Sequence, residues 1–323
     1  MSEGSNIQHF EGLSATDAEQ RGDLMQTQGK QQEALEHFQH AMLLYVQQNE
    51  RRKTADLYMK IGNLYSSIDD TENALGNFLE GLDIILTEND HEAVITYQLR
   101  IARFYQNVYQ FANATEHFNN ALNGAIESNN VPLIQEAHYS LGNCLNWMEK
   151  REEAMTELRK SLSYGSVDDS LKKKVLGSMG ILFNKMEDGK QALHYFEQSL
   201  ELNKATDNNI PFRATILKSM ALAYSILKDN AKALECLDES LECVKGLSDS
   251  GLLAVIHDHY AIVFENMGEH KKALEHLKKN KSYSDILTSE NVKLKTRELQ
   301  KRFDIAESQR EKEIFRLKNI DLA

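Results

Sequence analysis

The chain has 323 residues, of which two are proline, 16 are glycine and 8% are aromatic. At about 100–200 residues per domain, this length by itself suggests two domains. Sandwich, barrel and Rossmann folds need turn-forming residues at regular intervals, so the scarcity of proline argues against them and favours an all-α chain.

The formal net charge is −12, and it is unevenly distributed. Residues 281–323 carry ten basic and eight acidic side chains, which leaves −14 for residues 1–280. An acidic body repels a phosphate backbone, so we expect no nucleic-acid partner. No apolar run approaches the roughly 20 residues of a membrane span, and the first ten residues lack the plan of a signal peptide. A cytoplasmic protein without a membrane partner is expected.

Residues 1–13 are polar, contain glycine and serine, and are predicted to be flexible. From residue 14 to residue 284, one pattern of residue classes then recurs seven times with a period near 40. Each unit has a small residue: Gly22, Gly62, Ala102, Gly142, Gly180, Ala221 and Ala261. A large residue follows three positions later: Met25, Tyr65, Tyr105, Leu145, Phe183, Tyr224 and Phe264.

The second half of each unit has its own two fixed positions. Twelve residues after the small residue comes an alanine: Ala34, Ala74, Ala114, Ala154, Ala192, Ala233 and Ala273. Four residues further comes a bulky one: Phe38, Phe78, Phe118, Leu158, Phe196, Leu237 and Leu277. Small residues opposite bulky ones allow two antiparallel helices to pack tightly, so each unit is predicted to be a helical hairpin.

The two prolines support this register. Pro132 and Pro211 each lie ten residues or so before the small residue of a unit, and each follows an Asn-Asn pair by two positions. Proline is favoured in the first turn of a helix, and a preceding asparagine can cap that turn. Both prolines therefore indicate helix starts.

These offsets resemble the tetratricopeptide repeat, whose two helices carry Leu-Gly-x-x-Tyr and Ala-x-x-x-Phe patterns. The usual unit has 34 residues, and the additional six fit as extra helical turns. The resemblance implies a right-handed α-solenoid of about seven hairpins, with a concave groove lined by the first helices.

Residues 285–323 depart from the repeat pattern. They contain no proline or glycine and alternate in charge, which predicts one long exposed helix. Its apolar residues lie near heptad spacing, with Arg310 and Glu313 as interruptions: Val292, Leu299, Phe303, Ala306, Leu317 and Ile320. We favour a parallel coiled-coil homodimer, and the alternative is a helix that packs on its own repeats or frays.

A repeat array followed by such a helix also resembles bacterial cytoplasmic signalling proteins. In those proteins the helix joins a sensory array to an output domain, often a GGDEF diguanylate cyclase and otherwise a histidine kinase. The 323 residues contain no motif of either kind. The resemblance implies the input half of a longer signalling protein, and the alternative is a stand-alone scaffold or adaptor for assembling a complex.

Catalytic chemistry finds little support in the sequence. There is no phosphate-binding loop, nucleophile elbow or metalloprotease motif, so we expect no catalytic residue, metal or cofactor. His257-Asp258-His259 is the most enzyme-like string, but neighbouring helical residues point about 100° apart and do not converge on an ion. The pair His37 and His40, and the single Trp147 as a stacking surface, are weaker alternatives. Cys144, Cys236 and Cys243 fit structural roles.

The groove is the best candidate site. In the tetratricopeptide family its lining comes from first-helix residues one and four positions after the small residue. The second of these positions is polar in all seven units, although helix packing does not require it. Asparagine and glutamine can pair with a peptide backbone, and arginine can meet a carboxylate. The predicted lining for a protein or peptide ligand is Asn63, Arg100, Arg103, Gln106, Asn143, Asn146 and Asn184, with a solvated polar face as the alternative.

Overall fold

A computed structural model describes residues 12–68, 70–246, 249–286 and 288. The chain divides into two compact units, and the boundary between them in the sequence lies between Ile84 and Ile85. We call residues 12–84 the N-terminal unit and residues 85–286 the C-terminal unit. The predicted flexible residues up to 11 and the predicted dimer residues from Val292 to Ile320 lie outside the described residues.

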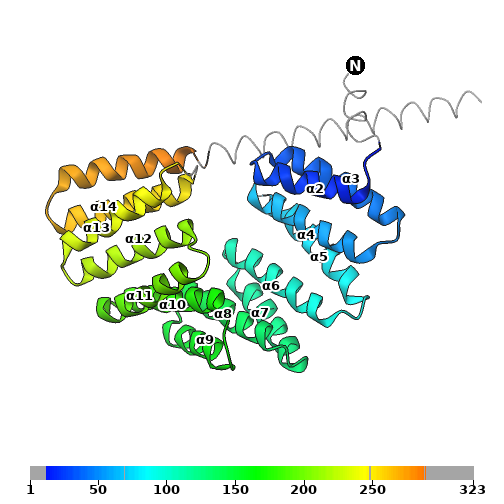
Figure 1. Ribbon diagram of the computed structural model, residues 1–323, viewed down its shortest axis with the longest axis horizontal. Helices are drawn as coiled ribbons and strands as arrows, with labels where there is room; N and C mark the ends of the chain where they lie inside the picture. The colour runs from blue at the N-terminus through cyan, green and yellow to red at the C-terminus, as the bar shows by residue number, and fades with distance from the viewer. Residues whose placement is uncertain (1–11, 69, 247–248, 287, 289–323) are drawn as a thin grey trace, which may run out of the picture. The chain divides into compact units, whose positions relative to one another are not determined.

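The described residues form helices joined by short turns, as the composition predicted (Figure 1). The helices are α2 (Ala15–Thr27), α3 (Gln31–Gln47), α4 (Arg51–Ser67), α5 (Thr71–Leu86), α6 (His91–Asn107), α7 (Phe111–Glu127), α8 (Val131–Trp147), α9 (Arg151–Ser163), α10 (Asp169–Lys185), α11 (Gly189–Ala205), α12 (Ile210–Ile226), α13 (Asn230–Val244) and α14 (Ser250–Asn266). A further helix occupies residues 270–286. Each predicted repeat is therefore one hairpin of a first and a second helix.

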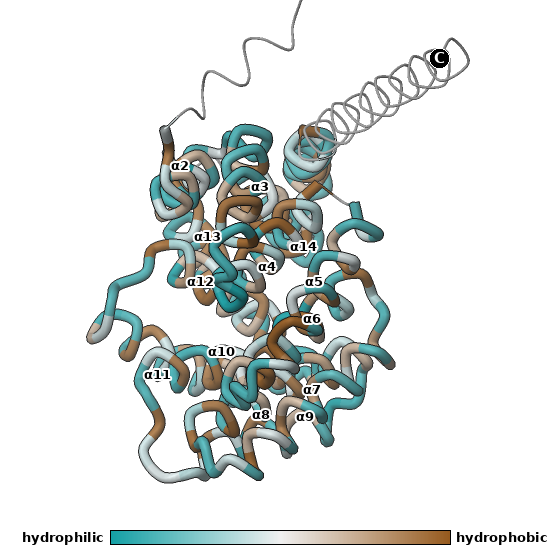
Figure 2. The backbone as a smooth tube through the Cα atoms, turned by 90° about the vertical axis from the view of Figure 1, so that its right-hand side faces the viewer, coloured by the Kyte–Doolittle hydropathy of each residue, from teal (hydrophilic) through white to brown (hydrophobic). Residues whose placement is uncertain are grey.

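The helices contain both hydrophobic and hydrophilic residues, which are interspersed along each helix (Figure 2). The alanine of each second helix is buried in all seven hairpins. The bulky residue four positions later is at most 1% exposed in the first six hairpins, whereas Leu277 in the last one is 46% exposed. Each bulky residue of the first six hairpins is followed by another hairpin, so burial tracks the presence of a neighbour.

The small residue of each first helix makes room for the bulky residue of its own second helix. A Cβ atom added at Gly180 would lie 2.5 Å from Cε1 of Phe196, and one at Gly22 would lie 2.5 Å from Cδ1 of Phe38. Real Cβ atoms do not approach other heavy atoms this closely, so a side chain at Gly180 or Gly22 would force the ring to shift. The predicted small-against-large packing is confirmed.

In the six hairpins where the structure describes it, the residue seven positions after the small residue has a left-handed backbone conformation. Glycine supplies it in the first and last hairpins, but four other hairpins use a side chain with positive φ: Tyr109, Glu149, Glu187 and Lys228. At Lys228, φ is 63°, and the next amide, of Asp229, donates to the carbonyl of Tyr224 at 2.9 Å. This bond closes the helix end in the Schellman manner, which favours glycine at the left-handed position.

Replacing Lys228 by glycine is expected to raise the free energy of unfolding by about 1 kcal/mol, because glycine adopts positive φ without steric cost. Lys228 is exposed and forms no ion pair among the described residues, so little else is lost. Urea unfolding measures the change. Lys228→Ala is the matched control, because it removes the same side chain but keeps the strained backbone; equal stability of the two variants would contradict the explanation.

The two prolines lie where the sequence placed them, in the first turns of α8 and α12. The side chain of Asn130 accepts a hydrogen bond from the Leu133 amide, and that of Asn209 accepts one from the Phe212 amide at 2.8 Å. The residues before these caps, Asn129 and Asn208, have positive φ and end the connecting turns. Asparagine tolerates this conformation better than most residues, which explains the paired asparagines.

A second packing position was not predicted. Nineteen residues after the small residue, the later second helices carry a polar side chain that donates to a carbonyl of their own first helix. Ser161 donates to Gln135 at 2.7 Å, Ser199 to Lys173 at 2.7 Å, and Ser240 to Ala214 at 2.8 Å. All three serines are fully buried. The serines therefore hold the two helices of each hairpin at a fixed distance and register.

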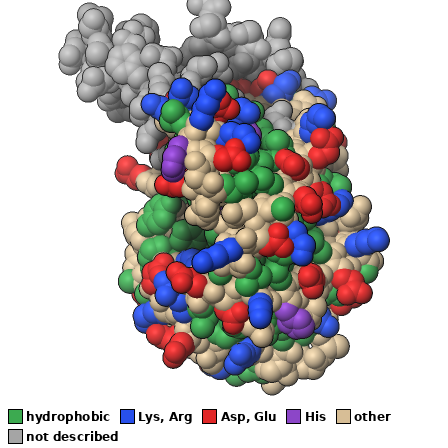
Figure 3. Space-filling model, turned by 90° about the vertical axis from the view of Figure 1, so that its left-hand side faces the viewer, with side chains coloured by type: hydrophobic (Ala, Val, Ile, Leu, Met, Phe, Trp, Pro, Cys, Tyr) green, Lys and Arg blue, Asp and Glu red, His purple; other side chains and the backbone are tan. Residues whose placement is uncertain are grey.

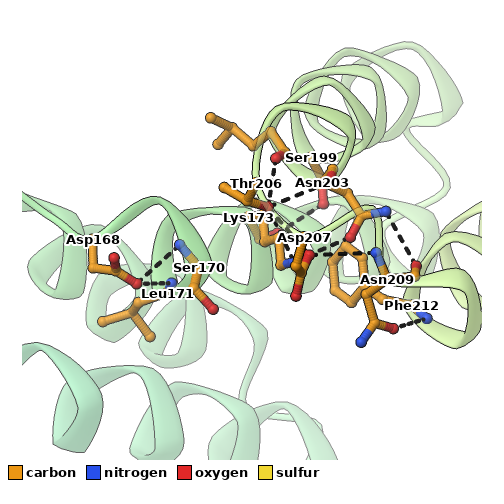
Figure 4. Close-up of polar contacts among 11 residues, drawn as sticks. Asp168, Ser170, Leu171, Lys173, Ser199, Asn203, Thr206, Asp207, Asn209 and Phe212 are labelled. Carbon is orange, nitrogen blue, oxygen red and sulfur yellow. Dashed lines mark hydrogen bonds and ion pairs between the residues drawn. The ribbon is translucent and has the colours of Figure 1, made fainter.

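Lys173 is a charged residue in the interior of the C-terminal unit. Its side chain comes from α10 and is directed toward the end of α11 and the start of α12, where polar groups surround its ammonium (Figure 4). Nζ donates to Oδ1 of Asn203 at 3.1 Å and to Asp207, and it lies 5.2 Å from the centre of the Phe212 ring. A buried ammonium needs such partners. Lys173 therefore fastens two consecutive hairpins together.

The first helices form one side of the C-terminal unit. Each packs on the first helix of the next hairpin, from α6 through α8, α10 and α12 to α14, and no successive second helices in the described part of the chain have comparable contact. Because the first helices approach one another more closely, the stack curves toward them. We call their free surface the inner face; it comprises the residues three before, one after and four after each small residue of α6, α8, α10, α12 and α14.

Candidate functional site

One predicted lining residue, Asn63, belongs to the N-terminal unit. It is exposed on α4. One turn away, Lys60 on the same helix pairs with Glu19 at 3.0 Å and with Asp23 at 2.7 Å, both on α2. The paired carboxylates raise the pKa of Lys60 although burial opposes this. Lys60 thus serves the contact between two first helices, and Asn63 is left facing solvent.

Arg103 and Gln106 belong to the inner face on α6, and Arg100 lies one position outside it. Arg103 is half-buried and donates to Glu136 at 2.7 Å and to Ser140 at 3.2 Å, both on α8. Arg100 is exposed, and Gln106 is half-buried. The structure therefore gives Arg103 an internal partner, while Arg100 and Gln106 have no hydrogen bond or ion pair to other described residues.

The asparagines of α8 and α10 form the polar centre of the inner face. Asn143 and Asn146 are half-buried on α8, whereas Asn184 on α10 is only 6% exposed. The amide of Asn184 donates to the carbonyl of Ser219 on α12 at 2.8 Å. Asn184 therefore differs from its prediction as an open groove residue, because its donor is used to join successive first helices.

Two of these asparagines have unused acceptors. Oδ1 of Asn146 and Oδ1 of Asn184 are shielded from solvent and have no hydrogen-bond partner among the described residues. A buried carbonyl oxygen without a donor costs about 1–3 kcal/mol. Both side chains occupy the same position of consecutive repeats, four residues after the small one. The inner face thus carries two equivalent acceptors that an additional N–H group would satisfy.

Beyond α8 the inner face becomes apolar at the position after the small residue. Ile181 and Leu222 are half-buried there on α10 and α12, and Ile262 on α14 is 36% exposed. All three occupy a predicted groove position, one residue after the small residue, although the predicted ligand-binding set contained only polar and basic residues. The period that revealed the asparagines places them on the same surface, so the combination of a polar row and an apolar row was detectable.

The histidines noted in the sequence pair across the two helices of a hairpin. His117 meets Gln98 at 2.6 Å, and His257 meets His276 at 3.1 Å between their Nδ1 atoms. Burial, and then the neighbouring His276, lowers the pKa of His257 to about 4. A recurring contact inside the hairpin thus explains why His117 and His276 share a repeat position.

The His257-Asp258-His259 string does not converge. His257 is turned into the hairpin, whereas Nδ1 of His259 donates to the carbonyl of Val255 on its own helix at 2.9 Å. In the described part of the chain, no three histidine, cysteine, aspartate or glutamate side chains are grouped closely enough to hold a metal ion. The string therefore provides no metal centre as it stands.

The cysteines and the tryptophan have ordinary surroundings. Burial raises the pKa of the Cys144 thiol and raises that of Cys236 to about 11, so neither is a ready nucleophile. Trp147 is 57% exposed. The centres of the Trp147 and Tyr109 rings lie 6.5 Å apart in a T-shaped arrangement, and the ammonium of Lys185 lies 5.8 Å from the centre of the Trp147 ring. Trp147 is thus a surface residue between neighbouring hairpins.

Charges of both signs are mixed on the outside of the C-terminal unit. Figure 3 shows acidic and basic side chains interspersed, with hydrophobic side chains between them, on the face that lies at the left of Figure 1. A nucleic-acid surface would instead gather basic side chains. Within the described residues, no helix is both long enough and apolar enough to traverse a bilayer.

Two segments of the sequence match the models of known protein families. Residues 212–279 match the tetratricopeptide repeat, and residues 14–148 match the soluble NSF attachment protein family, SNAP. Each match spans less than half of the chain. None of the curated proteins matches the sequence.

Solved structures share the fold at low sequence identity. A Rap protein complexed with competence and sporulation factor is 17% identical, with a TM-score of 0.64 over 85% of this chain and 76% of that chain. The Rap conjugation gene regulator of plasmid pLS20, in complex with the Phr* peptide, is 16% identical, with a TM-score of 0.65 over 90% and 78%. A tetratricopeptide repeat protein from Parabacteroides merdae is 18% identical, with a TM-score of 0.57 over 88% and 99%.

The repeat period, the hairpins and the small-against-large packing agree with these similarities. No diguanylate cyclase or histidine kinase appears among them, so that finer resemblance has no support. The described part of the chain is therefore an all-α array of helical hairpins, and its residues 212–279 match the tetratricopeptide repeat.

Proposed function

We propose that this protein is a regulatory binding module whose inner face holds an extended segment of a protein or peptide. The unused acceptors of Asn146 and Asn184 carry this proposal. They repeat with the period of the hairpins, as the N–H groups of an extended backbone repeat along a strand. Two solved Rap structures with a similar fold are complexes, one with competence and sporulation factor and one with the Phr* peptide, which agrees with the proposal.

The composition of the inner face favours a peptide over a small polar molecule. Asn143 and Gln106 can each donate and accept a hydrogen bond, and neither has a described partner. Ile181 and Leu222 follow on the next two first helices and offer apolar contact. An extended peptide is generally recognised in two ways at once. Its backbone forms hydrogen bonds with the binding protein, and its side chains contact apolar residues of that protein.

The signal relay forms the second part of the proposal. A dimer through Val292, Leu299, Phe303, Ala306, Leu317 and Ile320 would bring two arrays together, and ligand binding would change how they meet. No output domain is included, because neither a motif nor a similar protein supports a cyclase or a kinase. Sedimentation of the full chain and of its Leu299→Glu variant tests the dimer; a monomeric wild type at tens of micromolar would contradict it.

A direct test of the binding site starts with heptapeptides selected against the full chain from a random phage-displayed library. Replacing both Asn143 and Asn146 by alanine is expected to weaken the selected peptide about tenfold or more, because two hydrogen bonds to its backbone are lost. Isothermal titration calorimetry measures the change.

The control is Asn120→Ala, which removes an exposed asparagine from the second helix α7. It is expected to leave the affinity unchanged, and unfolding in urea verifies that all variants are folded. Selection of no peptide, or equal binding by the double variant and wild type, would refute the proposed site.

A further inference from the structure

Two large aromatic side chains meet on the surface of the C-terminal unit, where consecutive first helices end. Trp147 is the last residue of α8, and Tyr109 lies in the turn between α6 and α7. Trp147 is 57% exposed, and Tyr109, at 72%, is more exposed than any other large hydrophobic residue in the described part of the chain. Single exposed apolar residues are ordinary, but large ones side by side indicate an interaction surface. We call these two exposed rings the aromatic patch.

The aromatic patch is the outer end of a series of three rings. The centres of the Phe111 and Tyr109 rings lie 6.1 Å apart with their planes at 87°, and those of the Tyr109 and Trp147 rings lie 6.5 Å apart at 84°. Both contacts have the edge-to-face geometry that aromatic pairs prefer. Phe111 is half-buried at the start of α7, so the series begins in the array and ends at the solvent.

The backbone of Tyr109 is also unfavourable. Its φ is 60°, in the left-handed region that bulky residues seldom adopt. Burial of the ring would offset such a cost, but the ring of Tyr109 is exposed. Neither the conformation nor the ring contributes to the core, and residues of this kind are concentrated at functional sites.

Lys185, the last residue of α10, lies over the indole ring of Trp147. Its ammonium is 5.8 Å from the ring centre, donates to the carbonyl of Asn146 at 3.1 Å and lies 3.7 Å from a carboxylate oxygen of Glu149. A second cation at this ring would be repelled by the first. The aromatic patch therefore favours an uncharged apolar group over a lysine or arginine side chain.

The aromatic patch borders the polar centre of the inner face. Oδ1 of Asn146, the residue before Trp147, is shielded from solvent and has no hydrogen-bond partner among the described residues. Gln106 occupies the same repeat position on α6, three residues before Tyr109. Consecutive Cα atoms are 3.8 Å apart, so a backbone N–H that reaches Asn146 brings the side chains beside it close to the Trp147 ring.

We propose that the aromatic patch is a specificity subsite, which takes an aromatic side chain of the bound peptide. This inference rests on the proposed function and defines one residue of its ligand. An incoming ring can continue the edge-to-face series beyond Trp147, whereas an aliphatic side chain gains only the burial of its surface. Rigid aromatic side chains are also among the groups that most often dominate the affinity of an interface.

Peptide retention tests the preference for an aromatic ring. Three pools of heptapeptides with blocked termini carry Phe, Leu or Lys at the central position, and their other positions are random but lack aromatic residues. Each pool is offered at the same concentration to the immobilised full chain, and mass spectrometry measures the retained peptide. We expect about fivefold more retention of the Phe pool than of the Leu pool, and the least retention of the Lys pool.

Two variants remove the rings separately. Trp147→Ala should make retention of the Phe and Leu pools equal, while both pools still bind through the asparagines. Tyr109→Asn should reduce the preference for Phe and keep the turn, because asparagine tolerates positive φ. The matched control is Ile126→Ala, which removes a 47% exposed side chain from the second helix α7 and should behave as wild type. Urea unfolding verifies that the variants are folded.

The fluorescence of Trp147 gives an independent readout, because it is the only tryptophan of the chain. Peptides eluted from the Phe pool should shift its emission to shorter wavelengths, since the bound ring displaces water from the indole. Equal retention of the Phe and Leu pools by the wild type, an unchanged preference in Trp147→Ala, or an unchanged emission would overturn the subsite but leave the peptide-binding function standing. If no pool bound, the proposed function would be refuted, and the subsite with it.

Discussion

Replacing Gly62 by alanine is expected to lower the free energy of unfolding by about 1–3 kcal/mol, although alanine is the better helix former. The added Cβ would lie 2.6 Å from Cε1 of Phe78 and 3.1 Å from the carbonyl oxygen of Ala74. Phe78 is 1% exposed and has no free space into which its ring can turn. Urea unfolding of the full chain measures the effect.

Gly76, on α5 of the same hairpin, is the matched control. A Cβ added at Gly76 meets nothing within 4 Å, so Gly76→Ala is expected to raise stability by about 0.5–1 kcal/mol. Phe78→Leu should reduce the cost of Gly62→Ala, because the sixth hairpin combines an alanine, Ala221, with a leucine, Leu237, and both are fully buried. If Gly62→Ala and Gly76→Ala changed the free energy of unfolding in the same direction, the packing explanation would be contradicted.

Removal of Lys173 is expected to cost about 2–4 kcal/mol as Lys173→Ala, because a buried stem and several hydrogen bonds are lost together. Lys173 is 2% exposed, and its partner Asn203 is 1% exposed and would retain an unpaired oxygen. Lys173→Met should cost less, since it preserves the stem. Lys174→Ala, one residue along on the exposed side, should stay within about 0.5 kcal/mol of wild type.

The same cluster predicts a pH dependence. The hydrogen bond from Lys173 holds the pKa of Asp207 below its usual range. The folded protein therefore binds this proton less readily than the unfolded chain, so the contribution is complete above the unfolded pKa of about 4 and is lost as the pH falls through the lower folded value. Thermal unfolding between pH 6 and pH 2 should show a shallower acid decline in Asp207→Asn than in wild type; parallel profiles would contradict this assignment.

The repeat architecture could be predicted because the same pattern of small and bulky residues recurs seven times. A single Gly180 or Phe196 carries little information, but the recurrence of the pair at one spacing identifies the hairpin and its interior. The serine position of Ser161, Ser199 and Ser240 was missed, since the earlier units have alanine or glycine there and the pattern changes along the chain. A repeat pattern therefore predicts the contacts that all hairpins share, but it does not predict contacts that only some hairpins form.

The candidate site was less predictable for the same reason. Spacing placed Asn143, Asn146 and Asn184 on one surface, but it could not show that Asn184 donates to Ser219 or that Arg103 is paired with Glu136. These bonds depend on side chains from neighbouring helices, and each occurs in one repeat only.

Hydrogen–deuterium exchange of the full chain, with and without a selected heptapeptide, tests the central claim most directly. Binding along the inner face should slow the exchange of amide hydrogens in the first helices of the C-terminal unit. We expect the strongest protection in α8, α10 and α12. The second helices α9, α11 and α13 should change little. Protection confined to those second helices, or exchange that the bound peptide leaves unaltered, would contradict the account.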